Sequence, residues 1–173
     1  YQPLPYTVFK HKEAMEAFRY MAQGKHIGKI LINRDDPAIA VKDDRSYLIT
    51  GASGGLGMLF ANWFADQGAG EVILAARRDV RDVDPDGVKA IEAKGTRVTT
   101  VKADSGDRGQ VADMMASVKA HSLPLGGVIH AAGILSDAFI MNQDMASFEK
   151  VMAPKLAGAW YLHEETKDME LDM

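Results

Sequence analysis

One stretch of this chain restricts its possible folds more than any other. A short apolar run from Tyr47 to Thr50 leads directly into the glycine-rich turn Gly51-Ala52-Ser53-Gly54-Gly55-Leu56-Gly57, and an apolar, helix-favouring segment follows from Met58 to Asp66. A strand, a tight turn and a helix N-terminus in this order can bind the phosphates of a dinucleotide, because the first N–H groups of a helix are unpaired and carry partial positive charge. We therefore predict a cofactor-binding turn formed by Thr50, Gly51, Ser53, Gly54, Gly55, Leu56 and Gly57.

Three of these glycines have separate expected roles. Gly51 lets the chain turn sharply off the strand, Gly55 lets the backbone approach a pyrophosphate, and Gly57 lets the new helix pack closely. Glycines also serve ordinary turns, so a strand–turn–helix without a ligand is the alternative. The strand and helix patterns on both sides favour the dinucleotide site.

A pair of arginines bears on the choice of cofactor. The fully apolar run Val72–Ala76 predicts a buried parallel strand, and it ends at Arg77 and Arg78. In dinucleotide folds the residue about 20 positions after the turn meets the adenosine ribose, where an acid holds the 2′-hydroxyl of NAD. Arginine instead suits the 2′-phosphate of NADP, so we predict NADPH. Asp79 follows one position too late for the NAD role, which stays open, and two solvated arginines are the alternative.

Two further strand ends complete the predicted site. The alternating run 97–103 predicts a strand that ends at Asp104, where ligands collect in such sheets. Asp104 could instead cap the next helix, but Asp107 is the better cap and leaves Asp104 free. Residues 125–130 predict the next strand, and small residues after it would let the nicotinamide half of a dinucleotide lie close: Ala131, Ala132 and Gly133.

The remaining pattern gives the domain organisation. Residues 1–33 form a separate unit with strands at 6–9 and 27–32 around a helix at 10–22, residues 34–44 form a polar linker, and residues 45–173 form the main domain. Strands alternating with helices at 58–66, 86–93 and 110–121 predict an α/β fold with a doubly wound parallel sheet. A loop at 134–142 precedes a long helix at 144–166, which Pro154 is expected to kink.

Composition excludes several functional classes. The net charge is −4 without a basic patch, which argues against nucleic-acid binding, and the absence of cysteine excludes disulfides and thiolate chemistry. No apolar run reaches the roughly 18 residues of a membrane span, and the N-terminus does not resemble a signal peptide. The scattered histidines predict no metal site. We expect a cytoplasmic protein, and a start without Met suggests a piece of a longer chain.

Residues 45–166 resemble the catalytic half of a ketoreductase domain, a short-chain dehydrogenase/reductase-like module of type I reducing polyketide synthases and animal-type fatty acid synthases. The resemblance rests on TGASGGLG (50–57), Arg77-Arg78, Asp104, HAAG (130–133) and FEKVMAPKLAGAWYLHE (148–164). It implies a truncated Rossmann-type sheet, an adenine contact for Asp104, a structural role for His130, and Lys155 as the catalytic lysine. From sequence alone, Lys155 could equally extend into solvent.

Residues 17–29 (AFRYMAQGKHIGK) resemble the C-terminal tail of the enoyl reductase domain in such synthases. In that family the enoyl reductase directly precedes the catalytic half of the ketoreductase, and residues 1–33 followed by 45–166 reproduce this order. The resemblance implies an acyl carrier protein with a phosphopantetheine-bound acyl chain as partner, other synthase domains, and a homodimeric parent. His26 and Lys29 are expected to be non-catalytic.

The resemblance also implies what this chain lacks. The family's catalytic Ser, Tyr and Asn lie on the next strand and helix, and no Tyr-x-x-x-Asn follows here. We therefore expect reduction of a 3-oxoacyl thioester by the intact domain but no activity of this chain alone. In the resembled family, an acid at the position of Asp137 accompanies formation of the D-3-hydroxyacyl product. The alternative is that Asp137 is a loop residue with no influence on stereochemistry. A non-catalytic dinucleotide-binding module and a different short-chain reductase remain alternatives for the function.

Overall fold

The structure is a computed structural model that describes residues 4–33 and 40–173. The chain divides into two compact units, residues 1–38 and 39–173. Each unit is described by itself.

The first unit is a small βαβ element. It consists of β1 (Tyr6–Lys10), the 3₁₀ turn η1 (His11–Glu13), α1 (Ala14–Ala22) and β2 (Lys29–Asn33), and β1 pairs with β2 in parallel. The predicted helix from residue 10 thus begins as a 3₁₀ turn, and β2 starts at Lys29 rather than at 27. The reason is Gly28, which has φ +88° and packs against the carbonyl of Pro5.

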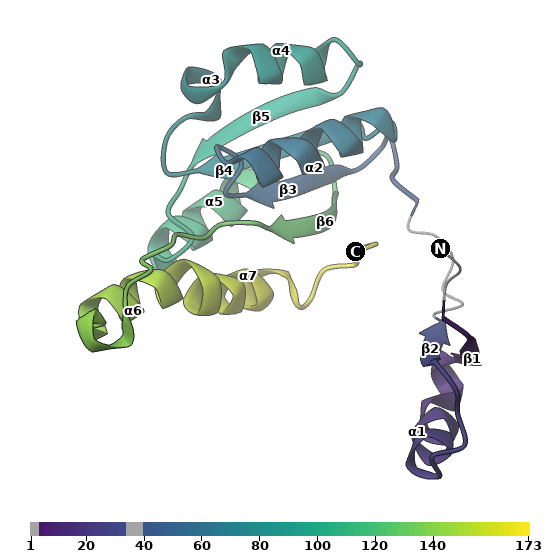
Figure 1. Ribbon diagram of the computed structural model, residues 1–173. Helices are drawn as coiled ribbons and strands as arrows, with labels where there is room; N and C mark the ends of the chain where they lie inside the picture. Colours follow the sequence, from purple (N-terminus) through teal and green to yellow (C-terminus); the bar gives the residue numbers. More distant parts are fainter. Residues whose placement is uncertain (1–3, 34–39) are drawn as a thin grey trace. The chain divides into compact units, whose positions relative to one another are not determined.

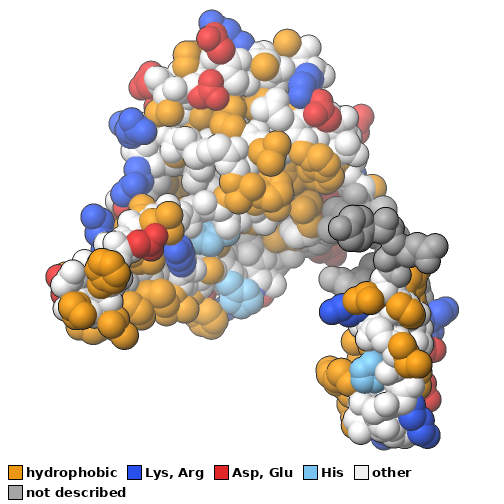
Figure 2. Space-filling view, in the orientation of Figure 1, with side chains coloured by type: hydrophobic (Ala, Val, Ile, Leu, Met, Phe, Trp, Pro, Cys, Tyr) orange, Lys and Arg blue, Asp and Glu red, His pale blue; other side chains and the backbone are white. Residues whose placement is uncertain are grey.

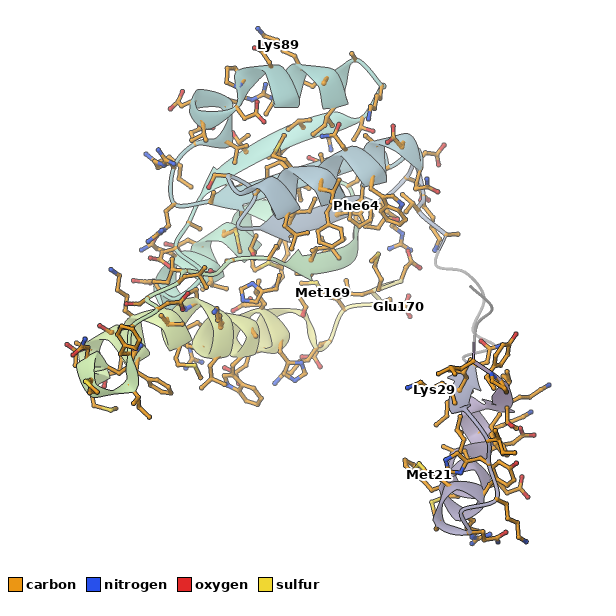
Figure 3. The ribbon with its side chains drawn as sticks, viewed as in Figure 1. Met21, Lys29, Phe64, Lys89, Met169 and Glu170 are labelled. Carbon is orange, nitrogen blue, oxygen red and sulfur yellow. The ribbon has the colours of Figure 1, made fainter. Side chains whose placement is uncertain are left out.

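Few apolar side chains of this first unit are covered. Of its described residues only Ala17 is buried. Figure 2 shows apolar side chains on its surface, and Met21 projects from α1 in Figure 3. The large apolar residues of the unit that are exposed are Leu4, Tyr6, Val8, Met15, Phe18, Met21, Ile27, Leu31 and Ile32.

The second unit is built on a parallel sheet. Among the described residues four strands form it: β3 (Ser46–Thr50), β4 (Glu71–Ala76), β5 (Arg97–Lys102) and β6 (Leu125–His130), in the order β5-β4-β3-β6. All three pairings are parallel, which confirms the predicted Rossmann-type doubly wound sheet. The direction of winding reverses between β3 and β6, and ligands bind beyond the carboxyl ends of the strands at such a point.

Helices cover both faces of this sheet (Figure 1). α2 (Gly55–Asp66) and α4 (Pro85–Glu92) pack on one face, where the ring of Phe64 stacks on Tyr47 at a centroid distance of 4.5 Å. α5 (Arg108–His121) and α7 (Gly158–Thr166) pack on the other. The predicted core positions Val111, Met114, Met115 and Val118 of α5 are all buried there.

Two segments differ from the predicted elements. The short helix α3 (Val80–Val83) was not expected, and the side chain of Asp79 caps it by accepting the N–H of Arg81 at 2.9 Å. The loop at 134–142 ends in a 3₁₀ turn, η2 (Ile140–Asn142). Large apolar residues in this turn and on either side of it along the chain are exposed: Leu135, Phe139, Ile140, Met141, Met145 and Phe148.

The predicted long helix is a run of three parts. α6 (Met145–Met152) continues into the π-helical turn η3 (Ala153–Ala157) and then into α7. Pro154 lies in η3 and has no N–H to donate to the preceding turn, so the hydrogen-bond register widens there. The N–H of Gly158 accordingly donates to the carbonyl of Ala153, five residues back.

The outer edge of β6 is partly covered by the end of the chain. The N–H groups of Asp172 and Met173 donate to the carbonyl of Gly126 at 2.7 and 3.2 Å. The ammonium group of Lys42 pairs with Asp172 at 2.6 Å. The last residues of the chain therefore cover part of this edge.

Candidate functional site

A cleft of about 520 Å³ lies at the carboxyl edge of the sheet. Residues that follow all four strands line it, and the glycine turn after β3 faces the segment after β6 across the reversal point. Its size lies within the roughly 300–1,000 Å³ of ligand sites. The predicted site residues in its lining are Thr50, Gly51, Ser53, Gly54, Arg77, Asp104, Ala131, Ala132 and Gly133.

Backbone packing explains two glycines of the turn. Gly51 has φ +68°, and a Cβ on it would lie 2.6 Å from the carbonyl oxygen of Ala131. A Cβ on Gly57 would lie 2.6 Å from Cα of Ala52. Neither position has room for a side chain, so the turn is held tightly between α2 and the segment after β6. Gly57 thus allows α2 to pack directly against the glycine turn.

The other turn residues leave backbone groups open. A Cβ on Gly55, the first residue of α2, would meet nothing within 4 Å. Leu56 is also in the first turn of α2, but its side chain is exposed and lies outside the cleft lining. The first N–H groups of a helix have no partner within the helix, so a helix start of this kind suits an anion.

Thr50 makes a contact that the sequence did not indicate. The residue is 2% exposed, and its hydroxyl oxygen lies 2.7 Å from Nδ1 of His130. Nε2 of His130 lies 2.7 Å from the carbonyl oxygen of Pro154. Both ring nitrogens of His130 are thus engaged within the protein, which agrees with the structural role expected for this residue.

The arginine pair is divided by the structure. Both side chains are exposed, but only Arg77 lines the cleft. The carboxylate of Asp79 accepts the N–H of Arg81 as a helix cap, so this acid already has a structural partner.

Asp104 is less free than predicted. Its Oδ1 accepts the N–H of Gly106 at 2.9 Å, because the chain turns immediately after β5. Asp107 caps α5 as expected by accepting the N–H of Gln110 at 3.0 Å. That hydrogen bond holds the pKa of the Asp107 carboxyl below its usual value.

The π-helical turn η3 lies against the loop after β5. A Cβ on Gly158 would lie 2.7 Å from the carbonyl oxygen of Ser105, and one on Gly106 would lie 3.2 Å from Cβ of Ala153. This close packing brings Ala153 and Pro154 into the cleft lining. The role of Gly158 was not predicted, because its partner is distant in the sequence.

Three further polar residues bear on the site. Lys155 is exposed and outside the cleft lining, but its Cε lies 3.3 Å from the position a Cβ on Gly133 would take, so its side chain runs beside the end of β6. Lys150, one turn earlier in α6, lines the cleft and was missed. No sequence pattern indicated it, because Ala153 and Pro154 reach the cleft only through packing against the loop after β5. Asp137 is exposed and outside the lining.

Comparison with known proteins identifies the family, since the KR domain profile matches residues 45–173. The chain belongs to the KR domain family. Over 98% of its length the chain is 34% identical to a phenolphthiocerol/phthiocerol polyketide synthase of Mycobacterium tuberculosis and covers 8% of it. It is 30% identical, over 97% of its length, to "Squalestatin tetraketide synthase" of Phoma sp. and covers 7% of that protein. The chain thus spans less than a tenth of these relatives.

Solved structures agree with this assignment. The KR domain is similar to an "N-terminal ketoreductase from macrolactin assembly line", with a TM-score of 0.73 and 33% identity over 80% of this chain and 29% of that one. It is also similar to "A-type Ketoreductases from Modular Polyketide Synthase", with a TM-score of 0.68 and 34% identity over 74% of this chain and 28% of that one.

Two negative findings apply to the described part of the KR domain and the first unit. No group of three or more His, Cys, Asp or Glu side chains there is arranged to hold a metal ion. None of the helices in residues 4–33 and 40–173 has the length and apolar character needed to cross a membrane.

Proposed function

We propose that this chain is the cofactor-binding part of a ketoreductase that uses NADPH to reduce a 3-oxoacyl thioester to a 3-hydroxyacyl thioester. The observation that carries this proposal is the cleft at the reversal point of the sheet, where the glycine turn, Arg77 and the small residues after β6 meet. The substrate would be carried on the phosphopantetheine arm of an acyl carrier protein.

The residues present fit a phosphorylated dinucleotide. The first N–H groups of α2 would hold the pyrophosphate, and the guanidinium of Arg77 would hold the 2′-phosphate. Asp104 retains its second carboxylate oxygen, Oδ2, for the adenine amino group, since Oδ1 accepts the Gly106 N–H. Ala131, Ala132 and Gly133 have little or no side chain and would leave room for the nicotinamide. When bound, NADPH supplies the hydride for the ketone.

Lys155 is the residue of this chain that we assign to catalysis. Its side chain runs beside Gly133, at the nicotinamide end of the proposed site. An ammonium group there favours the negative charge that develops on the carbonyl oxygen, and it lowers the pKa of a neighbouring tyrosine that donates the proton. That tyrosine, a polarising serine and an asparagine belong to the family resemblance and are not assigned to any residue of this chain.

The proposal extends to the rest of the parent protein. We assign residues 1–33 to the tail of an enoyl reductase domain and 34–44 to a linker. The many exposed apolar residues of the first unit support this assignment, because a domain of which they were part would cover them. Other synthase domains would be the partners, the parent would be a homodimer, and a cytoplasmic location remains our prediction. Asp137 stays a candidate for stereochemical control.

The test uses the reading frame extended by roughly one hundred residues, enough to complete a typical domain. The extended chain is co-expressed with the upstream half of the domain, and oxidation of NADPH or NADH is followed with a 3-oxoacyl thioester. We expect turnover that prefers NADPH and needs the extension. NADPH binding without turnover would favour the non-catalytic binding module, and turnover by the 173-residue chain alone would contradict the predicted dependence on the missing residues.

A further inference from the structure

His130 contacts both the end of β3 and the π-helical turn η3. It is the last residue of β6, and its ring is partly buried between the end of β3 and the turn η3. On one side Nδ1 lies 2.7 Å from the hydroxyl oxygen of Thr50. On the other, Nε2 lies 2.7 Å from the carbonyl oxygen of Pro154.

The partners determine which nitrogen carries the proton. The carbonyl oxygen of Pro154 can only accept a hydrogen bond, so Nε2 of His130 has to donate. In the neutral ring Nδ1 is then an acceptor, and the hydroxyl of Thr50 donates to it. Because Thr50 is 2% exposed, water does not compete freely for this hydroxyl.

The hydrogen bond from His130 to the Pro154 carbonyl is made at the least regular part of the helical segment 145–166. Pro154 lies in η3, where the N–H of Gly158 reaches back to Ala153. The ring of His130 also packs on this turn, since a Cβ on Gly158 would lie 3.3 Å from its Cε1. A π-helical turn is less stable than an α-helical one, so an external hydrogen bond to its carbonyl helps to keep the wider register.

Lys155 is the residue directly after Pro154, and its Cε reaches the space over Gly133, three residues after His130. The His130 ring therefore links two parts of the chain. One is the backbone of η3, which carries Lys155, and the other is the end of β6, beside which the Lys155 side chain lies. We propose that His130 is a positioning residue, which holds the π-helical turn through Pro154 and so keeps Lys155 at the nicotinamide end of the cleft. The link to catalysis rests on the proposed function of Lys155, whereas the structural connection does not.

The first experiment measures amide hydrogen exchange in the 173-residue chain. In His130→Ala the N–H of Gly158 should exchange roughly ten-fold faster, because its turn loses an outside partner. The N–H groups of Leu48 and Met115, in β3 and α5, serve as controls and should keep their rates. Equal acceleration at all three sites, or none at Gly158, would overturn the proposal, since His130 would then act only on global stability or not at all.

A second measurement avoids a variant that fails to fold. Nitrogen-15 NMR at mildly alkaline pH reports which ring nitrogen of His130 carries the proton. We expect the Nε2–H form in the unmodified chain and in Thr50→Ser, which keeps the hydroxyl. Thr50→Val removes the donor and should lower the population of that form. A dominant Nδ1–H form in the unmodified chain would overturn the assignment.

The third measurement uses the completed ketoreductase and separates the two proposals. His130→Ala should lower kcat roughly ten-fold and leave the KM for NADPH within about two-fold, because misplacing a catalytic group slows the chemical step. His130→Gln keeps a donor and should restore part of kcat. Unchanged kcat in His130→Ala would overturn the positioning role. Unchanged kcat in Lys155→Ala would instead refute the proposed function, whatever the exchange rates at Gly158.

Discussion

At the scale of single residues, the cleft contains charges of both signs. Arg77 and Lys150 line it together with the carboxylates of Asp104 and Asp107. Both carboxylates accept backbone N–H groups, and neither cation forms an ion pair within the described part of the chain. The cations are therefore the side chains of this cleft most available to a phosphorylated ligand.

Arg77 should set the preference for NADPH. In Arg77→Ala, affinity for NADPH should fall by about 10- to 100-fold while affinity for NADH changes little, because only NADPH carries a 2′-phosphate that pairs with the guanidinium. Arg78→Ala is the matched comparison and should have the smaller effect, since Arg78 lies outside the cleft lining. Fluorescence titration of both dinucleotides measures this. An equal loss for NADPH and NADH would refute the specificity role.

Lys150 should contribute to binding through charge alone. We expect Lys150→Gln to weaken dinucleotide binding about three-fold at low salt and less at high salt, because exposed charges are screened by ions. Lys89→Gln is the control, because Lys89 projects from α4 into solvent (Figure 3) and pairs with Asp86 at 3.6 Å. A loss independent of salt, or an equal loss in the control, would contradict this prediction.

At the scale of elements, the glycine turn and α2 form one closely packed unit, whereas the start of α2 faces open space. Gly57 has backbone atoms of Gly51 and Ala52 within 2.7 Å of the position of a Cβ, but Gly55 has none within 4 Å. Two glycines in the same helical turn therefore serve different purposes. Gly57 permits close packing, and Gly55 leaves the surface at the start of α2 open.

Alanine at these two positions should separate stability from binding. Gly57→Ala should lower the free energy of unfolding by about 1–3 kcal/mol, the usual cost of overpacking a close contact. Gly55→Ala should leave stability unchanged or raise it by up to about 1 kcal/mol, and should weaken NADPH binding. Chemical denaturation and NADPH titration of both variants measure this. Normal NADPH affinity in Gly55→Ala would show that the phosphate does not approach this residue.

At the scale of the whole molecule, one buried carboxylate joins three parts of the sheet. Glu71 begins β4, and its side chain is 1% exposed. It accepts hydrogen bonds from Arg97 at 2.6 Å and Thr99 at 2.7 Å in β5, and from the N–H of Leu123 before β6 at 2.9 Å. Burial alone would raise the pKa of Glu71, but these donors and the charge of Arg97 outweigh it, so the pKa lies below the usual 4.5.

Removing this charge should destabilise the second unit. Glu71→Gln should lower the free energy of unfolding at pH 7 by about 1–3 kcal/mol, because an amide nitrogen replaces one buried acceptor. Asp86→Asn is the control, since the Asp86 side chain is 93% exposed on α4 and has only an exposed Lys89 as partner. Urea denaturation measures both, and an equal change in the control would contradict the structural role.

The contribution of Glu71 should also depend on pH. Because its pKa is lower in the folded state, the stabilisation is complete above the unfolded pKa of about 4.5 and is lost as pH falls through the folded value. The difference in stability between the natural chain and Glu71→Gln should therefore shrink in acid. A difference that stays constant from about pH 7 to below pH 4.5 would show that ionisation of Glu71 is not what stabilises the sheet.

Local features of the sequence determined the sheet and many of the residues at its carboxyl edge. The glycine turn, the apolar strands and Arg77 are recognisable because each depends on residues that are adjacent or regularly spaced. Tertiary structure decided the contacts between distant residues. Thr50 and His130 are 80 positions apart, and His130 and Pro154 are 24 apart. No periodicity relates such pairs, since they meet only when parallel strands bring their ends to one edge and a helix packs across it. For the same reason the buried acceptor Glu71, the close contact at Gly158 and the place of Lys150 in the cleft became visible only in the folded chain.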